Sequence, residues 1–175
     1  MTPPSNAVTL RTSMPTDAAA LRELRLEALR LHPEAFSADV TTNEREPLSF
    51  WVERASHAAD DPEQVIYFAV VDGELIGMAG VRRGASPKTA HSAILWGVYV
   101  RPAWRGQRIV DQLVQGVLGW AGQQQVQLVK LAVIVTNTTA IRSYRRCGFS
   151  VYGVEPQAIC YNGRCYDELL MVQQL

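Results

Sequence analysis

The chain has 175 residues, of which 17 are basic and 17 acidic, so its formal net charge is zero, and 47% of its residues are hydrophobic. A neutral chain provides no overall field to recruit nucleic acid or a membrane surface, and this length suits one domain with a full core. Because no apolar run approaches membrane-spanning length and the amino terminus lacks a secretory pattern, we expect a cytoplasmic protein.

The amino-terminal part is predicted to combine a short strand with two helices. Residues 1–7 are polar and proline-rich, which predicts a loose tail before a single domain over 8–175. Thr16-Asp17 is a helix-start signal, and apolar residues then recur at helical spacing until the helix stops near Pro33. The predicted elements are a strand over 8–11, a helix over about 16–31, a loop over 32–46 and a helix over 48–59.

A hairpin and a buried strand follow. Two β-rich runs, residues 65–71 and 75–81, flank Asp72-Gly73, which is a turn dipeptide. After a flexible connection over 84–89, the nearly continuous apolar run over 93–100 predicts a strand that is buried on both faces. Arg101-Pro102 ends it, because proline cannot donate to a ladder.

The segment after this strand is a basic turn that opens an amphipathic helix. Arg105, Gly106 and Arg108 lie in the turn, and apolar residues then recur from Ile109 to Ala121 along one helix face. The free N–H groups and positive dipole end of such a helix favour an anion, most naturally a phosphate. From these residues alone, an ordinary strand–helix unit with an arginine-rich surface turn is an equal alternative.

The carboxy-terminal part contains a second informative stretch. A buried strand over 126–135 precedes a helix over 138–147, which Gly148 ends as a C′ glycine. Further strands are predicted over 149–154 and 166–172. Taken by themselves, Asn137 is a helix cap and Tyr144 is as readily a core residue as a functional one.

Two motifs resemble those of the Gcn5-related N-acetyltransferase (GNAT) superfamily. Val98-Tyr99-Val100-Arg101-Pro102 with Arg105-Gly106 resembles the strand end and coenzyme A pyrophosphate loop, Arg/Gln-x-x-Gly-x-Gly/Ala. Arg108 replaces the first motif glycine, and the bulkier Val110 replaces the closing glycine or alanine. The run from Asn137 to Phe149 is similar to the second motif, Asn-x-x-Ala-x-x-x-Tyr-x-x-x-Gly-Phe, at every named position.

The resemblance implies an α/β (α+β) GNAT-type single domain. Its central sheet would be mixed, mostly antiparallel, with six to seven strands and about four flanking helices. It also implies transfer of an acetyl group from acetyl-CoA directly to a primary amine of a small molecule or peptide. The alternative is a GNAT-like domain that binds or senses an acyl-CoA or another ligand without turnover.

The site residues that the resemblance implies come from both motifs. The backbone near the end of the central strand would hold the thioester carbonyl, the basic loop would hold the pyrophosphate, and Tyr144 would protonate the departing sulfur. The catalytic residues would be Tyr144 and Asn137. The residues predicted to bind acetyl-CoA are Val98, Tyr99, Val100, Arg105, Gly106, Gln107, Arg108, Ile109, Val110, Asn137 and Tyr144.

The acceptor side and the general base are less defined. The first two helices and their connection, with Phe36 and Trp51, should form the acceptor side, together with the segment after Gly153. Glu34, His91 and Glu155 are candidate bases, and an ordered water chain is an equal alternative; His32 and His57 are interpreted as surface residues. Nothing in the sequence defines the amine.

The remaining predictions concern partners and thiols. We expect a small-molecule amine as the partner, with no nucleic acid and no membrane, and a homodimer is left open. The three cysteines, Cys147, Cys160 and Cys165, have no metal-ligand spacing and are odd in number. The sequence therefore predicts no metal site, reduced thiols, and a Cys147 that acts as a small hydrophobe.

Overall fold

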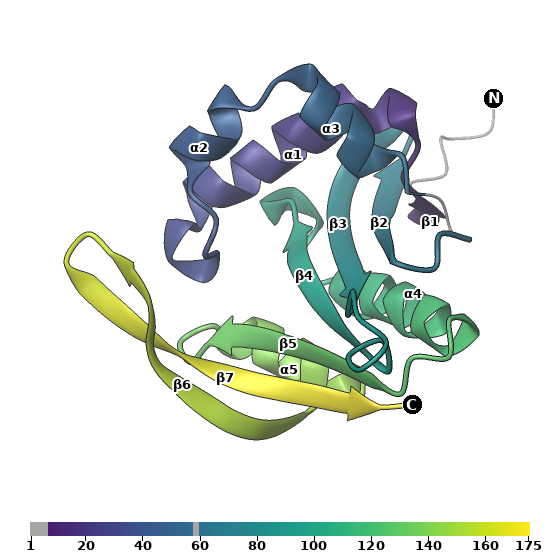
Figure 1. Ribbon diagram of the computed structural model, residues 1–175. Coiled ribbons are helices and arrows are strands. Elements are labelled where there is room, and N and C mark those ends of the chain that lie inside the picture. Colours follow the sequence, from purple (N-terminus) through teal and green to yellow (C-terminus); the bar gives the residue numbers. More distant parts are fainter. Residues whose placement is uncertain (1–6, 58–59) are drawn as a thin grey trace.

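The computed structural model describes residues 7–57 and 60–175, so residues 1–6 of the predicted tail lie outside the described part. Within these residues, seven strands form one sheet in the order β1-β2-β3-β4-β5-β7-β6 (Figure 1). The strands are β1 Thr9–Thr12, β2 Gln64–Val71, β3 Glu74–Arg83, β4 Ser92–Val100, β5 Leu128–Ile134, β6 Ser150–Tyr161 and β7 Arg164–Gln174. The helices are α1 Ala18–Leu31, α2 Val40–Arg45, α3 Leu48–Ala55, α4 Ile109–Gln123 and α5 Thr138–Arg146, with 3₁₀ turns η1 Pro15–Asp17, η2 Pro33–Ala35 and η3 Pro102–Trp104.

Helices cover both faces of the sheet, and each face has its own hydrophobic core. On one face, Leu21 of α1 and Trp51 of α3 pack with Phe68 and Met78 of the β2–β3 hairpin. On the other face, the apolar stripe of α4 packs with strand residues and with α5. The predicted helical periodicity of α4 is therefore confirmed, because its recurring apolar residues are the buried ones.

The sheet contains one parallel pair, β4 with β5, and the other neighbours are antiparallel. The β4–β5 pairing extends only over Ser92, Ala93 and Ile94, and the two strands then diverge (Figure 1). The predicted mixed, mostly antiparallel sheet is confirmed. The prediction that β4 is buried on both faces is wrong at Ile94, whose side chain is exposed.

The region over 32–46, predicted as a loop, contains η2 and α2. Asp39 begins α2 by accepting a hydrogen bond from the amide of Thr42 at 2.8 Å, which is a helix-capping contact. The following helix is shorter than predicted, because α3 ends at Ala55 and the end of the predicted range, residues 58–59, lies outside the described part.

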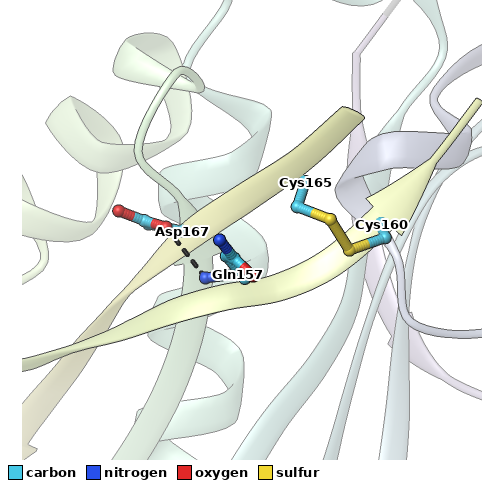
Figure 2. The surroundings of a disulfide bond; sticks show 4 residues. All are labelled: Gln157, Cys160, Cys165 and Asp167. Atoms are coloured by element: carbon cyan, nitrogen blue, oxygen red, sulfur yellow. Dashed lines mark hydrogen bonds between the residues drawn. A yellow bond between two sulfur atoms is a disulfide. The ribbon is translucent and has the colours of Figure 1, made fainter. Parts of the chain in front are cut away.

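The last two strands are longer than predicted and form a hairpin. Asn162 and Gly163 connect β6 to β7 with φ values of 48° and 76°, as a type I′ turn requires. Cys160 and Cys165 are opposite each other in this hairpin and form a disulfide (Figure 2). The prediction of reduced thiols is thus wrong for this pair, whereas Cys147 is free and buried.

The described helices include none that is long and apolar enough to cross a membrane.

Candidate active site

The divergence of β4 from β5 opens a cleft of about 680 Å³. β4 supplies one wall from Leu95 to Val100, and the end of β5 supplies another from Leu131 to Ile134. The start of α4, one face of α5 and the η2 turn complete the lining. Because no strand in the described part of the chain pairs with β4 on this side after Ile94, backbone polar groups of that edge are available to an extended ligand.

The backbone of β4 is irregular where it borders the cleft. Gly97 has φ +65°, in the left-handed region that favours glycine, and the register of β4 with β3 shifts around it. The side chain of Tyr99 is committed elsewhere, because its hydroxyl donates to Glu27 Oε1 at 2.8 Å. Burial, and then Glu27, raises the pKa of Tyr99 to about 12. At Tyr99 the side chain is therefore already engaged, so any contact that this part of β4 makes with a ligand would come from its backbone.

The loop before α4 has the conformation of an anion-binding turn. Gly106 has φ +83°, and Arg108, the residue before the helix, has φ +56°. The first hydrogen bond of the helix runs from the amide of Gln112 to the carbonyl of Arg108, so the preceding amides have no acceptor within the helix. Arg108 adopts the left-handed conformation that glycine at this motif position takes without cost.

The charges around this helix start are mostly positive. Arg105 donates through Nε to the carbonyl of Val100 at 3.0 Å, and its Nη2 lies 2.8 Å from His32 Nε2. Arg146 forms a bidentate pair with Asp111 at 2.7 and 2.9 Å, and this pair lowers the pKa of Asp111. The one carboxylate in the first turn of α4 is thus neutralised, which leaves the helix dipole free to favour a ligand anion.

α5 presents the residues of the second motif. Asn137 Oδ1 accepts from the amide of Ala140 at 3.1 Å, so the interpretation of Asn137 as a helix cap is confirmed. The NH₂ group of the Asn137 side chain donates no hydrogen bond to the described residues, so it is available to a ligand. Tyr144 is buried, and burial raises the pKa of its phenol above the ordinary value. Among the described residues, nothing forms a hydrogen bond with the Tyr144 hydroxyl, although the residue lines the cleft.

The cleft brings together the predicted site residues from both motifs, with one exception. Gln107 is exposed and does not line it. Arg101, which the sequence placed beside the loop, instead pairs with Glu27 and Glu74. Of the residues predicted to bind acetyl-CoA, those that line the cleft are Val98, Tyr99, Val100, Arg105, Gly106, Arg108, Ile109, Val110, Asn137 and Tyr144.

The acceptor side shows two further corrections. His32 is half-buried in the cleft, and its pKa is lowered by burial and by Arg105, whereas the sequence indicated a surface residue. His32 directly precedes η2, and its position in the sequence carried no periodic signal. Trp51 is fully buried in the core and does not reach the cleft. Of the candidate bases, Glu34 lines the cleft, and His91 and Glu155 do not.

Comparison with known proteins agrees with this geometry. The sequence model of the acetyltransferase (GNAT) family matches residues 20–149, which is most of the chain. The chain belongs to the GNAT family. Within the part of this GNAT protein that the structure describes, no three His, Cys, Asp or Glu side chains are grouped to hold a metal ion.

Two relatives of the GNAT protein have specific acceptors in their names. It is 29% identical over 150 residues to aminoglycoside N(6')-acetyltransferase type 1 of Stenotrophomonas maltophilia, covering 83% of this chain and 88% of that protein. It is 26% identical over 124 residues to L-amino acid N-acetyltransferase AaaT of Escherichia coli K12, covering 70% and 74%.

Solved structures share the fold of the GNAT protein. YncA of Salmonella typhimurium, whose structure was solved with its cofactor acetyl-CoA, has a TM-score of 0.78 and 22% identity, covering 97% of this chain and 94% of that one. The single GNAT-type domain predicted from the motifs has the fold of these relatives.

Proposed function

We propose that this GNAT protein transfers the acetyl group of acetyl-CoA directly to a primary amine of a small molecule. The observation that carries the proposal is the cleft itself. One cleft contains the open edge of β4, the amino terminus of α4 and the phenol of Tyr144. An extended thioester with a doubly charged pyrophosphate requires these three features together: strand-like pairing, an anion site and a donor for the departing sulfur.

The residues fit acetyl-CoA as follows. The amides at the start of α4 and the side chains of Arg105 and Arg108 would bind the pyrophosphate, and a Cβ at Gly106 would meet nothing within 4 Å, so the loop has open space for it. The β4 edge beyond Ile94 would pair with the pantetheine arm. The backbone of Val98–Val100 would donate to the thioester carbonyl, and Tyr144 would donate to the sulfur.

The acceptor amine must lose a proton before or during the transfer. An amine with a lysine-like pKa near 10.4 is neutral in only about one molecule in 2,500 at pH 7. Glu34 or water in the cleft would accept that proton. The neutral amine then forms the C–N bond, the C–S bond breaks, and the thiolate departs as a hydrogen-bond acceptor from Tyr144. Donors aimed at the developing oxyanion contribute most when they are fixed before the reaction, as strand amides are.

The test is release of free thiol from acetyl-CoA across a panel of amines, with mass spectrometry of the products. The panel contains amino acids, polyamines, aminoglycosides and a peptide with a free amino terminus. We expect amine-dependent thiol release and a product heavier by one acetyl group. Binding of acetyl-CoA without transfer to any amine would instead establish the alternative, a GNAT domain that binds or senses an acyl-CoA.

A further inference from the structure

Arg25 is a buried cation on α1 beside the cleft, with 7% of its surface exposed. A Cβ placed on Gly97, at the irregular point of β4, would lie 3.6 Å from Arg25 Nη1. The Arg25 guanidinium also lies over the ring of Phe36, with its Cζ 4.8 Å from the ring centroid. Gly97 and Phe36 both line the cleft, so the Arg25 side chain lies directly behind the lining on the acceptor side.

Nothing among residues 7–57 and 60–175 pairs with this guanidinium. Arg25 Nη1 is fully buried and has no hydrogen-bond partner there, and no carboxylate forms an ion pair with the side chain. Buried arginines are normally paired, because an isolated charge loses its hydration without compensation. Burial and the neighbouring Arg54 lower the pKa of Arg25 to about 10, so the group remains charged at neutral pH.

A second arginine makes this side of the cleft more positive. The Arg54 guanidinium lies 4.4 Å from the centroid of the Trp96 ring, and Trp96 lines the cleft. The ring is held against β3, where a Cβ on Gly80 would lie only 2.3 Å from it. Contacts with aromatic rings stabilise both cations in part, but they supply no anion.

We infer that the acceptor of the proposed acetyl transfer is an amine that carries a carboxylate, and that Arg25 binds this carboxylate. The inference rests on the proposed function, because it names the substrate class for the same site. The guanidinium reaches β4 at Gly97, directly before the backbone of Val98–Val100 that would hold the thioester. The amino and carboxylate groups of an α-amino acid are joined through one carbon atom, so an α-amino acid is the shortest acceptor that could present its amine to the thioester and its carboxylate to Arg25.

The same charges disfavour a polycationic acceptor. An aminoglycoside carries several ammonium groups, which the Arg25 and Arg54 guanidinium groups beside the cleft would repel. The structure thus points to an amino acid-like acceptor over an aminoglycoside, although the chain is similar to enzymes named for each.

The experiment compares matched acceptors. Thiol release is measured with the twenty standard L-amino acids, with the carboxamide and the decarboxylated amine of the best one, and with an aminoglycoside. Because truncating a buried charge pair is costly, we expect kcat/KM for the acid to exceed that for its carboxamide by at least about 100-fold. In Arg25→Met this ratio should fall to within a few-fold of one, chiefly through KM for the acid, and Arg25→Lys should recover part of it.

The controls separate binding from folding. Arg25→Met should retain the wild-type affinity for acetyl-CoA and a melting temperature at or above that of the wild type, since the change removes an uncompensated buried charge. Arg30→Met, on the exposed side of the same helix, should leave the acid-to-carboxamide ratio unchanged.

Turnover of aminoglycosides or carboxamides in preference to acids, or an acid preference that survives in Arg25→Met and Arg25→Lys, would overturn the inference while leaving the proposed function standing. Binding of acetyl-CoA with no acid-bearing amine acetylated would overturn it as well. Failure to bind acetyl-CoA would contradict both the inference about Arg25 and the proposed acetyl transfer.

Discussion

Replacing Tyr144 by phenylalanine should slow acetyl transfer without weakening acetyl-CoA binding. The change removes one oxygen atom, keeps the ring that packs near Phe149, and breaks no hydrogen bond within the described structure. The free energy of unfolding should therefore change by less than about 1 kcal/mol. Any loss of rate then reports on what the phenol does for the departing sulfur.

The environment of Tyr144 sets the size of that loss. Burial raises the pKa of the phenol, so complete proton transfer to a thiolate of a thiol with pKa near 8.5 is uphill. Most of the effect should come from a hydrogen bond to the developing negative charge, and bonds to charged groups contribute about 1.5–3 kcal/mol. We expect kcat to fall about a hundredfold, which corresponds to about 2.7 kcal/mol of transition-state stabilisation.

The assay measures kcat by thiol release and acetyl-CoA affinity by calorimetry, at a pH where deprotonation of the amine does not limit the rate. Tyr67→Phe is the matched control, because Tyr67 is a half-buried tyrosine on β2 away from the cleft, and it should leave kcat unchanged. If Tyr144→Phe turns over within a few-fold of the wild type, Tyr144 is a packing residue and the sulfur takes its proton from water.

Three further substitutions test other parts of the account. Gly106→Glu should abolish acetyl-CoA binding in calorimetry, because it places a carboxylate at the anion site. The control Gly106→Ala has the same backbone strain at φ +83° but no added charge, so it should lose much less of the affinity for acetyl-CoA. Val110→Ala should bind acetyl-CoA as tightly as the wild type or more tightly, and a folded but clearly weaker variant would show that Val110 contributes favourably. Glu168→Gln should raise the melting temperature at pH 7 more than at pH 4. Burial and the cross-strand Glu155 raise the pKa of Glu168, so its favourable contribution is present at low pH and is lost as the pH rises through that raised pKa. An equal shift at both pH values would contradict this assignment.

The sequence predicted those parts of the site that depend on local order along the chain. The strand–turn–helix unit from β4 to α4 and the cap at Asn137 follow from periodicity and from residues a few positions apart. Gly148 ends α5 with φ +93°, as expected of a C′ glycine.

The parts that the sequence missed depend on contacts between distant segments. His32 enters the cleft because η2 folds back onto the loop of Arg105, 73 residues further along the chain. Trp51 is as apolar as Phe36, and only the packing of α3 decides that Trp51 fills the core while Phe36 borders the cleft. The disulfide required knowledge that Cys160 and Cys165 face each other across a turn, and the Asn162-Gly163 signal for that turn was present in the sequence.

The most direct test of the central claim is a calorimetric titration of the wild-type protein with acetyl-CoA. We expect one site per chain with a dissociation constant on the order of 10 μM, which corresponds to about −7 kcal/mol. The binding should be lost in Gly106→Glu and kept in Tyr144→Phe. Absence of binding by the folded wild type at millimolar acetyl-CoA would contradict the assignment of the cleft and, with it, the proposed acetyl transfer.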